Sequence, residues 1–176
     1  VMHMMNDFFD CEKITGIEMN STHITIAKKY FGLNAKNIEL IEGDALSWVE
    51  NCSNDRAQKF DIIIDDLFYE EEGEPVKVSP PNATWFYNLY SLLKPKGMII
   101  MNFVGRRSAL SSAPLHDKNV AKLLPSGLHL TTPFYDNHVL AFSHHALNAS
   151  DVRKAVNEHD QLRLLKNNLR FSCRSC

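Results

Sequence analysis

The sequence lacks a strong charge bias, a long apolar run and a targeting signal. Its formal net charge is −2 at pH 7, which creates no global field that would attract nucleic acid or an anionic membrane. No apolar stretch approaches the roughly 20 residues of a membrane span, and the first residues lack the basic end and apolar core of a secretion signal. We therefore expect a cytoplasmic protein that binds neither nucleic acid nor a membrane.

Motifs of several catalytic classes are also missing. The four cysteines are too scattered for a disulfide framework. Cys173 and Cys176 form a C-x-x-C, which without a second pair or nearby histidines is a weak metal signal, so we expect a loose tail there. The eight histidines show no H-E-x-x-H spacing, and the chain has no G-x-S-x-G and no P-loop. These absences exclude the common signatures of metalloproteases, serine hydrolases and P-loop nucleotidases, and we expect no metal site.

What the sequence does contain is a regular alternation of predicted strands and helices. Expected strands cover 13–19, 37–41, the start of 59–68, 98–104, 128–134 and 138–143. Expected helices cover 1–9, 21–31, 45–51, 83–93, 108–124 and 151–169, and the helix over 108–124 is expected to be interrupted near Pro114. This alternation predicts an α/β sandwich with a mainly parallel sheet, and the last two strands predict a C-terminal antiparallel hairpin. At 176 residues the chain is most simply a single domain, residues 1–176.

Two acidic positions follow the first two predicted strands. Glu18 ends the strand KITGIEM, where a carboxylate can accept both hydroxyls of a nucleotide ribose or stabilise the following helix through its dipole. Asp44 follows the strand NIELI in a Gly43-Asp44 turn. It can accept from an exocyclic amine, with Ala45 leaving room for a flat base, or it can cap the next helix.

The stretch KFDIIIDDLF predicts a strand buried on both faces that ends in two acids. Because ligands bind outside the carboxyl ends of such strands, Asp66 is the candidate base, and Asp65 the structural neighbour on the opposite face. The alternative for Asp66 is capping and loop hydrogen bonding. The following segment, LFYEEEGEPVKVSPPN, is predicted to be a long loop, either an acidic lid or a solvated surface.

Four motifs together resemble a known family. The strings ITGIEMN, IELIEGDAL, FDIIIDDLF and LLKPKGMIIMNF stand in the order found in class I S-adenosylmethionine-dependent methyltransferases. They most closely resemble the spermidine synthase-like group of aminopropyltransferases. The match covers roughly residues 13–104, and the predicted terminal hairpin also suits this Rossmann-like fold.

The resemblance implies a role for each candidate residue. Glu18, with the adjoining Met19, would bind the cofactor ribose, and Asp44 with Ala45 would contact the adenine. Asp66 falls on the position of the catalytic aspartate that accepts a proton from the attacking amine. The implied cofactor is S-adenosylmethionine or its decarboxylated form, the implied partner is a small-molecule amine, and the family suggests a homodimer.

Two departures from the family pattern leave alternatives open. The family's second acid, three residues after the catalytic one, is replaced by Tyr69. None of the seven glycines forms a G-x-G, so we expect an N-terminally truncated or degenerate domain whose open strand edges are covered by another segment or chain. The function is then transfer of an aminopropyl or methyl group or, alternatively, non-catalytic binding or assembly. A nicotinamide dehydrogenase would also use Glu18, but the GDA turn and the hairpin argue against it.

Overall fold

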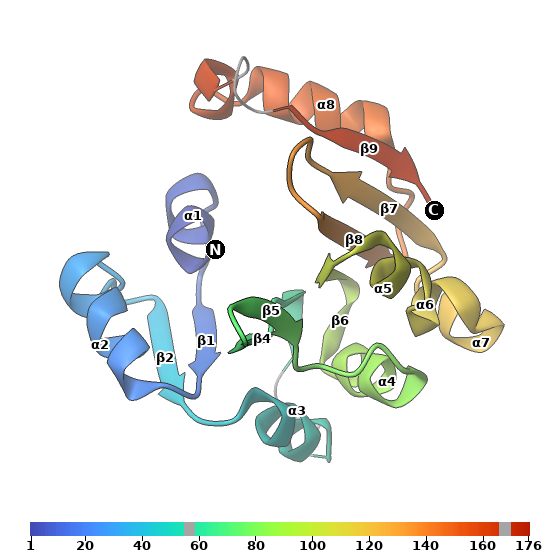
Figure 1. Ribbon diagram of the computed structural model, residues 1–176. Helices are drawn as coiled ribbons and strands as arrows, with labels where there is room; N and C mark the ends of the chain where they lie inside the picture. The colour runs from blue at the N-terminus through green and yellow to red at the C-terminus, as the bar shows by residue number, and fades with distance from the viewer. Residues whose placement is uncertain (55–58, 166–169) are drawn as a thin grey trace. The chain divides into compact units, whose positions relative to one another are not determined.

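A computed structural model describes residues 1–54, 59–165 and 170–176. The chain folds into two compact units, Val1–Asn51 and Cys52–Cys176 (Figure 1). No helix in the described part of the chain has both the length and the apolar character needed to cross a membrane.

The first unit is a two-stranded parallel sheet with three helices. Its elements are α1 (Met2–Phe8), β1 (Ile14–Glu18), α2 (Ser21–Tyr30), β2 (Ile38–Glu42) and α3 (Ala45–Asn54), the last of which continues past the unit boundary. Strands β1 and β2 pair in parallel from Ile14↔Ile38 to Glu18↔Glu42. Asn20 caps α2 by accepting from the Thr22 amide, and Gly32 follows this helix at φ +65°, where glycine carries no steric cost.

The second unit is built on a five-stranded sheet in the order β3-β6-β8-β7-β9. Its strands are β3 (Phe60–Asp65), β6 (Leu93–Val104), β8 (Asn137–Ser143), β7 (Ser126–Thr131) and β9 (Ser172–Ser175). Strands β3 and β6 are parallel, whereas the pairs β6–β8, β7–β8 and β7–β9 are antiparallel. The predicted α/β class and the C-terminal hairpin of β7 and β8 are confirmed. The five-stranded sheet is mixed rather than mainly parallel, because three of its four strand pairs are antiparallel.

Helices cover both faces of this sheet. On one face α4 (Ala83–Ser91) buries Phe86 and Leu89 completely, and the Phe86 ring meets Phe142 of β8 edge to face at 5.9 Å. On the other face Val152 of α8 (Ala149–Glu158) packs with Phe171 on a cluster that includes the buried Leu128. Side chains alternate between the two faces along each strand, so even-numbered residues of β6 face the α8 layer.

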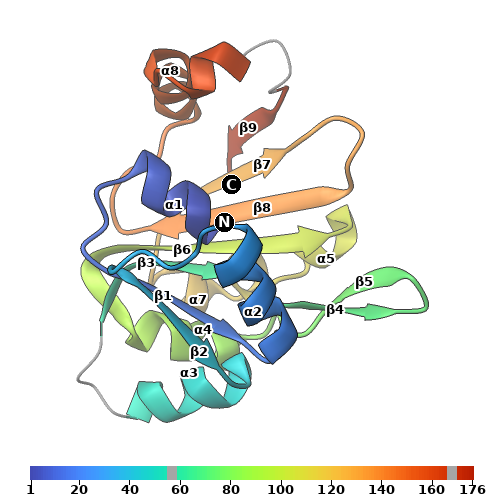
Figure 2. The ribbon, with the colours of Figure 1, turned by 90° about the vertical axis from the view of Figure 1, so that its left-hand side faces the viewer.

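The acidic segment after β3 forms a hairpin rather than the predicted loop. Strand β4 (Phe68–Glu71) pairs with β5 (Glu74–Lys77), and the hairpin projects away from the sheet of the second unit (Figure 2). Glu72 and Gly73 connect the strands at φ +52° and +85°. Two consecutive positive φ angles are typical of two-residue hairpin turns. The run of glutamates in this segment favoured a loop in the sequence analysis, so the hairpin was not predicted.

The C-terminal prediction of a loose tail was wrong. Cys173 lies in β9, is only 3% exposed, and pairs with Leu130 of β7. The predicted helix 151–169 is shorter than expected, since α8 ends at Glu158 and a 3₁₀ turn covers Leu162–Leu165. Residues 166–169 of that prediction lie outside the described residues.

The predicted helix 108–124 is interrupted near Pro114 as expected, and a second break at Asp117 divides it into three short helices. These are α5 (Arg106–Leu110), α6 (Ala113–His116) and α7 (Lys118–Ala121). Pro114 stands in the first turn of α6, where its missing amide hydrogen costs nothing. Asp117 ends α6 and caps α7, so the chain changes direction at that residue.

Strands β1 and β3 each have one free edge. In the described part of the chain, β1 pairs with β2 alone and β3 pairs with β6 alone. Unpaired edges of buried strands are normally covered. The expectation that a further segment or chain covers them stays a prediction.

Candidate functional site

Glu18 and Asp44 lie at the same end of the small sheet in the first unit. Glu18 is the last residue of β1, and Asp44 follows β2 after a one-residue turn. The amide of Gly43 donates to the carbonyl of Glu18 at 3.1 Å, which ties that turn to the end of β1. The parallel pairing therefore brings both acids to the carboxyl edge, where ligands of such sheets bind.

The Glu18 carboxylate uses one of its two oxygens within the protein. Oε1 accepts from the amide of Asn20 at 2.8 Å and lies 3.4 Å from Nδ1 of His23. Among the described residues, Oε2 has no hydrogen-bond partner, and the side chain is 41% exposed. The carboxylate thus supports the start of α2 and still offers one oxygen to a hydroxyl donor. Met19, beside it, is 73% exposed.

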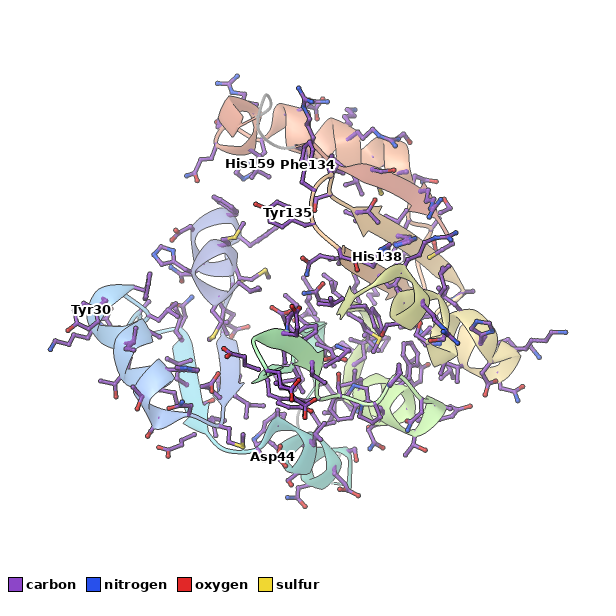
Figure 3. The ribbon with its side chains drawn as sticks, in the orientation of Figure 1. Tyr30, Asp44, Phe134, Tyr135, His138 and His159 are labelled. Atoms are coloured by element: carbon purple, nitrogen blue, oxygen red, sulfur yellow. The ribbon has the colours of Figure 1, made fainter. Side chains whose placement is uncertain are left out.

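Asp44 caps α3, which is the second of the two roles expected for it (Figure 3). Oδ1 accepts from the amide of Leu46, and Oδ2 accepts from the amide and the hydroxyl of Ser47 at 3.1 and 2.6 Å. These hydrogen bonds, the Ser47 hydroxyl first, lower the pKa of Asp44. A carboxylate has about four acceptor positions, so Oδ1 can still receive an exocyclic amine. Ala45 follows in the first turn of the helix.

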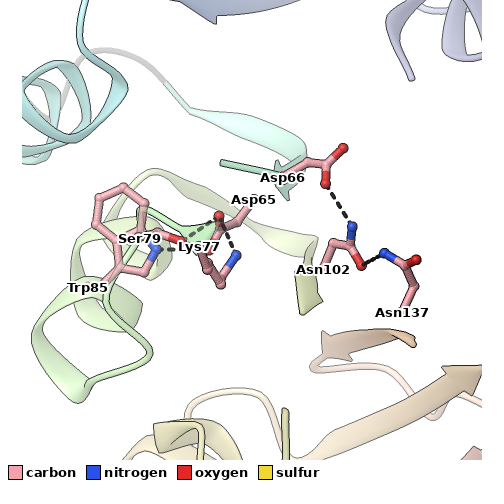
Figure 4. Close-up of polar contacts among 7 residues, drawn as sticks. All are labelled: Asp65, Asp66, Lys77, Ser79, Trp85, Asn102 and Asn137. Carbon is pink, nitrogen blue, oxygen red and sulfur yellow. Dashed lines mark hydrogen bonds and ion pairs between the residues drawn. The ribbon is translucent and has the colours of Figure 1, made fainter. Parts of the chain in front are cut away.

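In the second unit, Asp65 is enclosed by donors from β5, from α4 and from the segment between them (Figure 4). Its carboxylate accepts from the Ser79 hydroxyl at 2.8 Å, from Nε1 of Trp85 at 3.0 Å and from Nζ of Lys77 at 3.0 Å. The Asp65 side chain is 1% exposed and that of Lys77 is 9% exposed. Asp65 therefore anchors the β4–β5 hairpin and α4 to β3, in agreement with the structural role expected for it.

Asp66 points away from this cluster and is exposed (Figure 4). Its Oδ1 accepts from Nδ2 of Asn102 at 2.9 Å, and Oδ1 of Asn102 accepts in turn from Nδ2 of Asn137 at 3.4 Å. The three residues form a polar row across β3, β6 and β8 at the carboxyl end of β3. In the described part of the chain Oδ2 of Asp66 has no partner, so one carboxylate oxygen is oriented by an amide and the other is available.

Sequence reasoning missed Asn102 and Asn137. Asn102 could have been identified as the one amide in the otherwise apolar strand MIIMNFV. A buried strand normally carries apolar side chains, so a polar residue there indicates a specific hydrogen bond. Asn137 was assigned to the turn of the hairpin, although it opens β8. Its approach to Asn102 follows only from the antiparallel pairing of β6 and β8.

The other candidates near Asp66 make only local contacts. Tyr69, which replaces the family's second acid, is 46% exposed and donates to Oε2 of Glu71 at 3.3 Å. Desolvation and the neighbouring Glu71 raise the pKa of Tyr69. Trp85 is a buried core residue. The described residues contain no group of three or more side chains suited to hold a metal ion.

Comparison with known proteins adds relatives by sequence and by structure. The eEF1A lysine and N-terminal methyltransferase of Danio rerio is 25% identical over 115 residues, 63% of this chain and 17% of that protein. Human methyltransferase-like protein 13, crystallised in complex with SAH, superposes with a TM-score of 0.67 at 18% identity and covers 91% of this chain and 75% of its own. Spermidine synthase from Thermotoga maritima superposes with a TM-score of 0.56 at 17% identity, over 85% of this chain and 50% of its own. The two structural likenesses show the fold.

The family assignment comes from a family model. The chain spans less than a fifth of the zebrafish relative, so that protein's activity is not transferred to it. A model described as a methyltransferase domain matches residues 2–137, which include Glu18, Asp44, Asp66 and Asn102. This match extends over most of the sequence, and the chain belongs to the methyltransferase domain family.

Proposed function

We propose that this chain forms part of an S-adenosylmethionine-dependent methyltransferase that modifies a nitrogen or oxygen nucleophile. The observation that carries the proposal is the Asp66 carboxylate at the carboxyl end of β3, held through one oxygen by Asn102 and open at the other. The family assignment supports methyl transfer. The cofactor is supported by neighbours of the same fold crystallised with SAH, the product that S-adenosylmethionine leaves after methyl transfer.

The acids of the first unit fit the polar groups of this cofactor. The free oxygen of Glu18 can accept from a ribose hydroxyl. The remaining capacity of Asp44 Oδ1 can accept from the exocyclic amine of adenine, and Ala45 presents only a methyl group to the base. Because both carboxylates are already fixed by backbone amides, binding costs little side-chain entropy.

Asp66 holds the acceptor and takes its proton. When bound, the cofactor supplies an electrophilic methyl group on a sulfonium, which is already a good leaving group. The protein therefore mainly has to position the acceptor and keep its nucleophile unprotonated. The amide of Asn102 fixes one oxygen of Asp66, so the other faces the acceptor, and a small-molecule amine is the first acceptor class to test.

Aminopropyl transfer from decarboxylated S-adenosylmethionine is the second version of the reaction. The spermidine synthases support it through the shared fold, at 17% identity. The exposed Tyr69 at the position of the second acid opposes it, since a neutral phenol does not attract a cationic polyamine. Methyl transfer is accordingly the version we propose.

Calorimetry on the full-length protein tests the cofactor. S-adenosylmethionine should bind saturably, and Glu18→Ala should weaken it at least tenfold, about 1.4 kcal/mol. Asp66→Asn should leave the affinity within that factor. If neither S-adenosylmethionine nor its decarboxylated form binds, the transferase proposal is refuted and a non-catalytic domain is favoured.

Turnover then tests Asp66. With a panel of small amines and hydroxyl compounds, formation of SAH should depend on Asp66 and disappear in Asp66→Asn. Asp61→Asn is the matched control, because Asp61 is an exposed acid of the same strand that pairs with Lys94. An Asp66→Asn enzyme with wild-type turnover would remove the proposed role of this carboxylate.

A further inference from the structure

A groove in the second unit lies between the end of β7, helix α8 and the start of β9. It has a volume of about 540 Å³, within the range of small-molecule sites. Thr131 lines it from the last position of β7, Thr132 from just after that strand, Arg153 and Asn157 from α8, and Arg170 from the chain entering β9. Figure 1 shows α8 running beside β7 and β9 at this place.

The charge of the groove is one-sided. Two arginines line it, and none of the described lining residues is acidic. The acids of α8 and the first acid after it have other partners. Asp151 accepts from Nδ2 of Asn148 at 3.1 Å, Glu158 pairs with Lys154 at 4.0 Å, and Asp160 pairs with Arg163 at 3.1 Å. An unbalanced pair of guanidinium groups in a concave site favours an anion.

The two arginines differ in how firmly they are held. Arg153 donates through one terminal nitrogen to the carbonyl of Cys173 at 2.8 Å, so its guanidinium is positioned while most of its five N–H donors remain. Arg170 forms no hydrogen bond or ion pair with the other described residues. One guanidinium is thus preorganised and the second is free to close on a ligand.

The remaining walls combine hydrogen-bond donors with an apolar surface. The hydroxyl of Thr132 and the amide of Asn157 can donate to an oxyanion. Val156 and Phe171 supply apolar contacts, and Phe171 is itself packed on the core cluster of the sheet. These walls suit a ligand that joins an anionic group to an apolar body.

The groove also lies where ligands of this architecture bind. Thr131 ends β7, and Ser172, its partner in register, begins β9, so both stand at the sheet edge that carries the carboxyl end of β3. Phe171 faces α8, the same side to which residue alternation assigns Asn102. Three strand spacings of about 4.8 Å separate β3 from β7, roughly 14 Å in all.

We propose that this groove is a binding site for a small organic anion, a phosphate or carboxylate carried on an apolar body. The arginines bind the oxyanion, the Thr132 hydroxyl and the Asn157 amide complete its hydrogen bonds, and the apolar body lies against Phe171. The site is separate from Asp66 and does not depend on the proposed methyl transfer.

The test is titration calorimetry of the full-length protein with phenyl phosphate, benzoate and the uncharged benzyl alcohol at fixed ionic strength. Both anions should bind one site and compete with each other, whereas benzyl alcohol should not bind. Saturable binding of phenyl phosphate alone would identify the ligand as a phosphate, and of benzoate alone as a carboxylate. If neither anion binds saturably at concentrations up to about 10 mM, the proposal is wrong. A dissociation constant of that size corresponds to a binding free energy of roughly −3 kcal/mol.

Variants locate the binding. Arg170→Gln should weaken the anion at least tenfold, since it removes charge-assisted hydrogen bonds, and Thr132→Val should weaken it less. Arg163→Gln is the matched control, because this exposed arginine pairs with Asp160 and does not line the groove. Equal losses in Arg170→Gln and Arg163→Gln would show nonspecific attraction and overturn the assignment. Binding of S-adenosylmethionine should be the same in all three variants.

Discussion

Removing the Asp65 carboxylate should destabilise the second unit far more than removing its neighbour. In Asp65→Ala the Lys77 ammonium keeps its buried position, 9% exposed, without an anion. The Ser79 hydroxyl and the Trp85 indole also lose their acceptor. Breaking one partner of a buried ion pair costs about 3–5 kcal/mol, so we expect a loss of about 4 kcal/mol in the free energy of unfolding.

Two aromatic rings reduce the expected loss of unfolding free energy in Asp65→Ala, because they also stabilise the Lys77 ammonium. Nζ of Lys77 lies 5.1 Å from the ring centre of Phe68 and 4.9 Å from that of Phe103. Each such contact contributes about 0.5–2 kcal/mol to holding the cation, which keeps the expected loss below the upper end of the range. Lys77→Met should therefore recover stability in the Asp65→Ala background, because it removes the unpaired charge and keeps the apolar stem.

Urea unfolding followed by circular dichroism measures these differences. With a slope of about 2 kcal/mol per M, a loss of 4 kcal/mol lowers the urea midpoint by about 2 M. Asp66→Ala is the matched control and should lose at most about 1 kcal/mol, because its carboxylate is exposed and accepts from one amide. A loss below about 1.5 kcal/mol in Asp65→Ala, or further destabilisation by Lys77→Met in that background, would refute this reasoning.

Three further predictions follow from single contacts. Asn102→Ala removes the hydrogen bond that orients Asp66, so it should lower kcat about tenfold with little change in the cofactor KM. Steady-state kinetics measure both constants, and a change in KM alone would contradict this prediction. Gly97→Ala should cost about 1–3 kcal/mol in urea unfolding, because a Cβ there would lie 2.9 Å from a backbone carbonyl of β3, whereas Gly43→Ala meets open space and should be neutral. Burial first, and then the second histidine of its pair, lowers the pKa of His129, so the unfolded chain binds a proton more readily below about pH 6.5. The melting temperature should therefore fall as the pH falls from about 7.5 to 5.5, and a His129→Gln protein with an unchanged slope would contradict this assignment.

The sequence determined most of the element types and the positions of the acids, but it missed β4, β5 and β9. Three isoleucines before Asp65 and Asp66 indicated a strand with two carboxylates at its end, and β3 is that strand. The prediction that it is buried on both faces was wrong, because Ile62 is 39% exposed and Ile63 and Ile64 are only half-buried. Asn20 and Gly32 marked the two ends of α2 by local chemistry, which needs no tertiary partner. Such local rules also gave the terminal hairpin.

Only the tertiary structure decided what each acid touches. Lys77 and Trp85 stand 12 and 20 residues from Asp65, and Asn102 stands 36 residues from Asp66. The hydrophobic periodicity of the sequence cannot predict such contacts, because strand register and chain reversal bring these residues together. The same reason explains the missed β9: a short strand at the end of the chain exists only because the edge of β7 pairs with it. Asp65 and Asp66 carry the same carboxylate group. They differ because neighbouring residues at the end of β3 point to opposite faces, which buries the Asp65 carboxylate among its donors and leaves the Asp66 carboxylate exposed.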